Sequence, residues 1–159
     1  IIVENIKQRG GDPFLVDPRN IMTPHLGGEF PTEVRKDLYD QVKNSSGVVF
    51  CTPEYNGTFS SVLMALLENL GYPLAISDKP VCLLGVASGK IGAIKALEHL
   101  RSVCAHSGAL VLPRSLSIAQ VDKVFDDQGV CLDLQIKEQM HQFTNQLFRY
   151  LQEPVFRPQ

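Results

Sequence analysis

Four continuous apolar runs constrain the fold of this chain more than any other feature of its sequence. They cover residues 14–16, 47–51, 81–87 and 109–112. None of them alternates polar with apolar residues, a pattern typical of strands that are buried on both faces of a sheet. Successive runs start roughly thirty residues apart, about the length of one βα unit. The runs therefore predict an α/β fold with a parallel sheet and right-handed crossovers.

Helical patterns fill the gaps between these runs. The apolar spacing predicts a helix from Thr32 with a stripe of Val34, Leu38 and Val42. Three more helices are predicted over 58 or 60 to 70, with Val62 facing inward, over 91–106, with Ile94 facing inward, and over 134–151. Residues 117–133 are expected to form a long surface loop with a turn at 126–129.

The opening segment, residues 1–11, is compatible with two structures. Ile1, Ile2 and Val3 are β-branched and could form a strand. We favour the tail of a helix, because Ile2, Val3 and Ile6 share a helical face and a Gly-Gly pair follows as a natural stop.

Composition and charge exclude several classes of protein. The 159 residues are 44% hydrophobic and 20% charged, which is typical of a globular chain and suits a single domain over 1–159. The net charge of −2 gives no reason to expect nucleic acid or an anionic membrane as a partner. The apolar runs are also too short to span a bilayer.

The four cysteines point to a reducing compartment. Cys51, Cys82, Cys104 and Cys131 show neither metal-ligand spacing nor a C-x-x-C motif, so we expect no metal site. No secretory signal pattern is visible at the start of the chain. These features predict a cytoplasmic protein without disulfides.

Two of the predicted strand ends look specialised for binding a ligand. The first continues as Thr52, Pro53, Glu54, Tyr55, Asn56 and Gly57, and the second as Ser88, Gly89, Lys90, Ile91 and Gly92. Ligands of open parallel sheets bind outside the carboxyl ends of the strands. A tight Asn-Gly turn and two closely spaced glycines both let the backbone approach a ligand, although neither loop is a dinucleotide or P-loop fingerprint.

Together these loops resemble the NAD(P)H-dependent FMN reductase family of flavodoxin-like proteins. The string T-P-E-Y-N-G at 52–57 is the most specific motif, and the turn at 88–92 is similar to the second flavin loop of the family. Residues 108–113 are similar to its fifth strand, and 125–129 to the turn before its last helix. The resemblance covers essentially the whole chain.

This resemblance implies a doubly wound, three-layer α/β/α fold with strand order 2-1-3-4-5 and FMN at the switch point. The flavin would rest against Pro53–Gly57, with the backbone N–H groups of Glu54, Tyr55 and Asn56 facing its polar edge. Thr52 would belong to the same loop, and Ser88 and Gly89 would line the other side. No side chain is expected to act as a catalytic acid or base, because the cofactor supplies the redox chemistry.

The resemblance also implies the reaction and the partners. Hydride would pass from NAD(P)H to bound FMN and then to a small-molecule acceptor, such as a quinone, an azo dye, a free flavin or a metal oxyanion. The apolar helix at 60–70 would pack between subunits of a homodimer or homotetramer.

The sequence departs from the family at its start. The first strand of the family, and the Gly-, Ser-, Arg- and Asn-rich loop that holds the FMN phosphate, have no counterpart here, because residue 1 already falls in the following helix. We therefore expect the first strand to be missing from this sequence.

The sequence leaves one main alternative function open and disfavours another. A truncated or non-catalytic flavodoxin-like domain, unable to hold FMN and used for binding or oligomerisation, is the main alternative. A receiver domain is disfavoured, because its acidic cluster at the strand ends is replaced by Thr52, Pro53, Glu54, Ser88 and Gly89.

Overall fold

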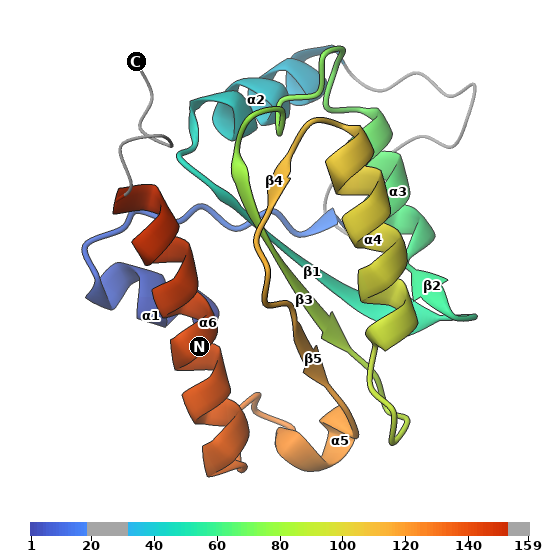
Figure 1. The fold of residues 1–159 in the computed structure, drawn as a ribbon, viewed down its shortest axis with the longest axis vertical. Helices are drawn as coiled ribbons and strands as arrows, with labels where there is room; N and C mark the ends of the chain where they lie inside the picture. The colour runs from blue at the N-terminus through green and yellow to red at the C-terminus, as the bar shows by residue number, and fades with distance from the viewer. Residues whose placement is uncertain (19–31, 153–159) are drawn as a thin grey trace.

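The central sheet is built on two long neighbouring strands, β1 (Val48–Tyr55) and β3 (Pro80–Val86) (Figure 1). The structure is a computed structural model that describes residues 1–18 and 32–152. The two strands run parallel from Val48 to Pro53 on β1. β3 also pairs in parallel with two short strands, β4 (Leu110–Val111) and β5 (Leu116–Ile118). An antiparallel hairpin strand, β2 (Thr58–Phe59), lies beyond β1, so the order is β2-β1-β3-β4. The predicted parallel sheet is confirmed.

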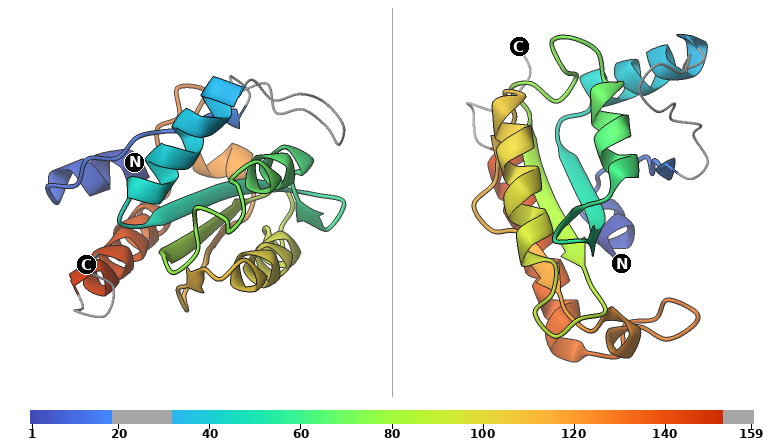
Figure 2. Two further views of the ribbon diagram at one scale, coloured as in Figure 1. Left: turned by 90° about the horizontal axis from the view of Figure 1, so that it is seen from above. Right: turned by 90° about the vertical axis from the view of Figure 1, so that its right-hand side faces the viewer.

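Helices cover both faces of this sheet (Figure 2). α3 (Ser61–Glu68) and α4 (Ile94–His106) lie on one face, and α2 (Thr32–Asn44) adds Leu38 and Val42 to the core on that side. α6 (Leu134–Gln152) and α1 (Ile2–Gln8) lie on the other face, while the short α5 (Val121–Val124) follows β5. This arrangement confirms the three-layer α/β/α fold.

The alternation of side chains along β3 explains why there are two separate cores. Val81 and Leu83 pack with α3 and α4, whereas Cys82 and Leu84 pack with Met140 and its neighbours on α6. Successive residues of a strand point to opposite faces, so a continuous apolar run is required when both faces are covered.

The opening segment is a helix, as favoured from the sequence. α1 ends before Gly10, which has a φ of +79°. Arg9 then fixes α1 to α6, because its Nε donates to Oδ1 of Asn145 over 2.8 Å.

The strand predicted over residues 14–16 is wrong. The structure has no regular element there, and Phe14 and Leu15 are 45% and 78% exposed. The apolar run is short and lies between Pro13 and Pro18, neither of which has an N–H group to donate to a ladder.

The fifth strand of the sheet is interrupted, and the loop predicted over 117–133 is partly wrong. The run at 109–112 forms only β4, and the chain pairs with β3 again as β5 and then forms α5. Pro113 causes the interruption, because it cannot donate to the ladder. The predicted turn at 126–129 is confirmed, since Oδ1 of Asp126 accepts from the N–H groups of Gln128 and Val130.

The helices predicted from Thr32 and over 134–151 are confirmed, and the other two are confirmed but begin later than predicted. Thr58 belongs to β2, and Ser60 caps α3 by accepting from the N–H of Leu63 over 3.3 Å. Residues 91–93 precede α4. Three side chains expected to face inward are exposed, because each lies at the flank of a helix that buries a narrower stripe: Val34 and Val62 at 42% and Ile94 at 48%.

The buried thiols make stability dependent on alkaline pH. Burial raises the pKa of Cys82 and Cys104 to about 12, from an ordinary value of 9.0, with Gln146 and Arg101 respectively opposing the shift. The unfolded chain therefore loses these protons at a lower pH than the folded chain. Because both thiols stay protonated in both states below pH 9, stability is retained there and falls above it.

We expect the free energy of unfolding to fall between pH 8 and pH 10 by about 1.4 kcal/mol for each buried thiol. Urea unfolding at several pH values measures this slope. A Cys82→Ala, Cys104→Ala double variant is the control, and its slope should be shallower. An unchanged slope in the double variant would contradict the assignment to these thiols.

Candidate functional site

The two loops predicted to bind a ligand begin side by side. The register pairs Pro53 on β1 with Val86 on β3, so both strands deliver their carboxyl ends to the same edge of the sheet. Ser88 and Gly89 come just after the end of β3, and both are exposed. The structure therefore brings the loop at 52–57 and the loop at 88–92 together, as the topology requires.

The first loop is a β-hairpin with a two-residue turn. Tyr55 pairs with Thr58, and the turn residues Asn56 and Gly57 have φ values of 52° and 73°. Two successive positive φ angles are the requirement of a type I′ turn, for which Asn-Gly is a preferred pair. Glu54 and Tyr55 pair with β2, whereas Asn56 lies in the turn, and the Tyr55 side chain is 62% exposed.

Thr52 lies beneath the loop rather than on its surface. Its side chain is fully buried, and Oγ1 accepts from the N–H of Ser60 over 3.1 Å while donating to the carbonyl of Pro53 over 2.9 Å. The hydroxyl thus ties the end of β1 to the start of α3. The role that fits this geometry is holding the loop, a role that the sequence did not indicate.

The second loop is supported from behind by residues that were predicted to lie in a surface loop. The N–H of Gln120 donates to the carbonyl of Gly89 over 3.1 Å, and the N–H of Val121 donates to the carbonyl of Ala87 over 3.1 Å. Ser88 Oγ lies 3.4 Å from Oδ1 of Asp122. These contacts were missed because they depend on β5 continuing the sheet after the break at Pro113.

The carboxylate of Glu54 turns toward helix α4. Its Oε2 accepts a hydrogen bond from the N–H of Ala96 over 3.0 Å, in the first turn of that helix. The sequence left open whether this side chain tunes a flavin or caps the local turn. The structure shows instead a cap on a helix that lies 42 residues further along the chain.

An open pocket lies beside the hairpin, between α3 and α4. It has a volume of about 960 Å³ and is lined by residues of the hairpin and of the two helices, namely Glu54, Tyr55, Asn56, Thr58, Phe59, Ser61, Met64, His99 and Val103. Nδ1 of His99 lies 3.2 Å from Oγ1 of Thr58. Three predicted site residues thus reach this pocket, whereas Ser88 and Gly89 lie outside its lining.

The exposed parts of the two loops offer an aromatic side chain and open surface at the same edge of the sheet. Tyr55 offers an aromatic face, and the surface around Gly89 is open, since a Cβ there would meet nothing within 4 Å. Within residues 1–18 and 32–152, no strand end carries a loop of the Gly-, Ser-, Arg- and Asn-rich kind that holds an FMN phosphate. The features at these strand ends would therefore suit the ring half of the cofactor.

The described part of the chain holds neither a cluster of metal ligands nor a helix that could span a membrane. No three His, Cys, Asp or Glu side chains there are grouped as ligands of a metal ion. None of the helices in that part combines the length and apolar character needed to cross a membrane.

Known proteins with related sequences include flavin, azo and quinone reductases. The model of the NADPH-dependent FMN reductase family matches residues 1–123. An NAD(P)H-dependent FMN reductase of Pseudomonas aeruginosa is 29% identical over 116 residues, covering 71% of this chain and 62% of the relative. An NADPH azoreductase of a Bacillus species is 39% identical over 84 residues, covering 53% of this chain and 47% of the relative. The matches cover between 37% and 62% of the length of these two relatives and of the NADH:(hydroxy)cinnamate reductase subunit CrdA of Vibrio ruber.

A solved structure shares the fold. FerB of Paracoccus denitrificans, a flavoenzyme NAD(P)H:(acceptor) oxidoreductase, superimposes with a TM-score of 0.78 at 19% identity, over 94% of this chain and 85% of that one. With the family model matching well over half of its residues, this chain belongs to the NADPH-dependent FMN reductase family.

Proposed function

We propose that this chain forms the flavin-ring site of an FMN-dependent NAD(P)H oxidoreductase. The observation that carries the proposal is the pairing of Pro53 with Val86, which sets the T-P-E-Y-N-G hairpin beside the Ser88–Gly89 turn at one edge of the sheet. Membership of the FMN reductase family supports the same cofactors, FMN and NAD(P)H. The chemistry that bound FMN supplies is hydride transfer from the nicotinamide to a second acceptor.

The residues of the chain would position the reactants. The rigid turn at Asn56 and Gly57 and the exposed Tyr55 would orient one side of the flavin, and Ser88 and Gly89 the other. Thr52 would act from below by keeping the hairpin fixed to α3. Positioning of this kind accelerates a reaction by removing the entropic cost of orientation.

The acceptor in this proposal is a small molecule. Relatives are named azoreductase, 2-hydroxy-1,4-benzoquinone reductase and quinone reductase, which supports an azo or quinone acceptor, with free flavins and metal oxyanions as further candidates. We further propose a cytoplasmic homodimer or homotetramer. The exposed Val62 and Met64 on α3 support this assembly, because burial between subunits would remove their apolar surface from water.

The test is retention of FMN by the purified chain. After incubation with FMN and removal of free ligand, we expect a yellow protein whose absorbance near 450 nm is bleached by NADPH. A subsequent addition of a quinone should restore the colour. A colourless protein would contradict the proposal and favour the alternative of a non-catalytic flavodoxin-like domain that serves in binding or oligomerisation.

A further inference from the structure

The first turn of α4 packs unusually close to the sheet. A Cβ added to Gly85 on β3 would lie 2.7 Å from Cβ of Ala93 and 3.0 Å from Cγ of Leu97. Ala93, the N-cap residue of α4, is fully buried in this contact. The packing therefore requires a small side chain at the position where a helix is normally capped.

Small size at this position has a cost for the helix. The N-cap side chain normally accepts a hydrogen bond from an N–H of the first turn, and Ser, Thr, Asp and Asn are preferred there. Ala93 has no such acceptor. Glu54 supplies it from another element, because Oε2 accepts from the N–H of Ala96, the third residue of α4. A carboxylate also interacts favourably with the positive end of the helix dipole.

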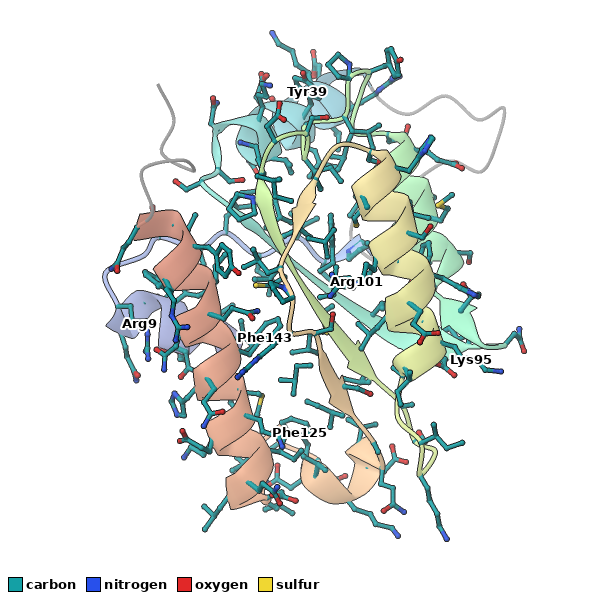
Figure 3. All side chains as sticks on the ribbon, in the orientation of Figure 1. Arg9, Tyr39, Lys95, Arg101, Phe125 and Phe143 are labelled. Atoms are coloured by element: carbon teal, nitrogen blue, oxygen red, sulfur yellow. The ribbon has the colours of Figure 1, made fainter. Side chains whose placement is uncertain are left out.

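The same helix end is also held by β5. The N–H of Ala93 donates to Oγ of Ser117 over 2.9 Å, and Ser117 precedes the segment that supports Ser88 and Gly89. The first turn of α4 also reaches the hairpin turn, since Cδ of Lys95 lies within 3.5 Å of the position that a Cβ of Gly57 would take. Figure 3 shows Lys95 at this end of α4, beside β2.

We propose that Glu54 is a positioning residue that fixes the distance between the two flavin loops through the first turn of α4. The inference rests on the proposed function for its cofactor, but the tie itself is a property of the chain. Glu54 lies on the hairpin, and its partner Ala96 belongs to the helix that continues from the 88–92 loop. Removing the carboxylate frees the two loops to move apart without opening the core.

Two substitutions at Glu54 separate the hydrogen bond from the charge. In Glu54→Ala, no acceptor remains, and we expect the Kd for FMN, measured by flavin fluorescence quenching, to rise about tenfold. Glu54→Gln retains an oxygen that can accept from Ala96, and its Kd should stay within about threefold of the unsubstituted chain. This rescue by glutamine is not expected if the side chain acts only through its charge.

A second readout does not need the cofactor. Amide hydrogen exchange of the FMN-free protein should show faster exchange at Ala96 in Glu54→Ala than in the unsubstituted chain, with Glu54→Gln between them. Glu98→Ala is the matched control, because Glu98 is an exposed carboxylate on the same helix. It should leave both the Kd and the exchange at Ala96 unchanged.

The outcomes distinguish this inference from the proposed function. If the unsubstituted chain retains no FMN, the proposed function fails. Amide hydrogen exchange at Ala96 and across 88–92 then decides alone whether Glu54 holds the two loops together through its hydrogen bond from Ala96. Unchanged exchange in Glu54→Ala would overturn the inference. So would a Kd for Glu54→Ala equal to that of Glu98→Ala, or a Glu54→Gln variant as weak as Glu54→Ala.

Discussion

Replacing Gly85 by alanine is expected to lower the free energy of unfolding by about 3 kcal/mol, near the upper end of the cost of overpacking a core. The added Cβ would lie 2.7 Å from Cβ of Ala93, closer than two non-bonded carbon atoms can approach without strain. Ala93 is fully buried, so relief requires that the first turn of α4 move away from β3. Urea unfolding measures the loss, and weaker FMN binding should accompany it because the bond from Ala96 to Glu54 lengthens.

Two matched variants test this steric explanation. Adding Ala93→Gly to Gly85→Ala removes the opposing Cβ and should restore part of the lost stability, because only the buried Leu97, whose Cγ would lie 3.0 Å away, then has to shift. Gly89→Ala makes the same chemical change where a Cβ meets nothing within 4 Å, and it should be nearly neutral. A Gly85→Ala variant as stable as Gly89→Ala would contradict the close packing of α4.

Replacing Arg101 by methionine is expected to cost about 3 kcal/mol of stability, since several hydrogen bonds from a charged donor are lost at once. The guanidinium of Arg101 reaches from α4 to the break between β4 and β5 (Figure 3). There it donates to the carbonyls of Val111, Leu112 and Pro113, and to Oγ of Ser115. Without it, the part-buried acceptors on Val111, Leu112 and Ser115 lose this donor at the point where the ladder is interrupted by Pro113.

The position of Arg101 determines which residues lose protection from amide exchange in the Arg101→Met variant. Amide exchange should accelerate in residues 111–118 and, to a smaller extent, in the 88–92 loop that this segment supports. Arg101→Lys can satisfy only some of the acceptors and should have an intermediate stability. Arg114→Met removes an exposed arginine from the same segment and should change stability by less than about 0.5 kcal/mol. Equal losses in Arg101→Met and Arg114→Met would contradict this role.

The sequence predicted the parallel sheet because long apolar runs without alternation are typical of strands buried on both faces, whereas the strand order came only from the family resemblance. The run at 47–51 and the run at 81–87 became the two central strands, and the Asn56-Gly57 dipeptide became the turn between β1 and β2. The run at 14–16 failed, because its length and apolar character do not reveal the missing N–H groups of the flanking prolines.

The supporting contacts of the site could not be predicted in the same way. Glu54 and Ala96 are 42 residues apart, and their bond depends on how closely α4 packs on Gly85. The segment after Pro113 contains few apolar residues in a row, so nothing local indicated that it pairs with β3 again as β5. Apolar patterns in the sequence locate helices and strands, whereas these contacts depend on how distant helices and strands pack together.

The strand β1 also determines where this chain can tolerate insertions and deletions during evolution. One face of β1 carries Phe50, Thr52 and Glu54. Phe50 packs in the core, Thr52 bonds to the start of α3, and Glu54 caps α4. An insertion of one residue upstream within β1 would turn all three side chains to the opposite face. The exposed turn at 126–129 carries none of these contacts, so changes of length there leave the site intact.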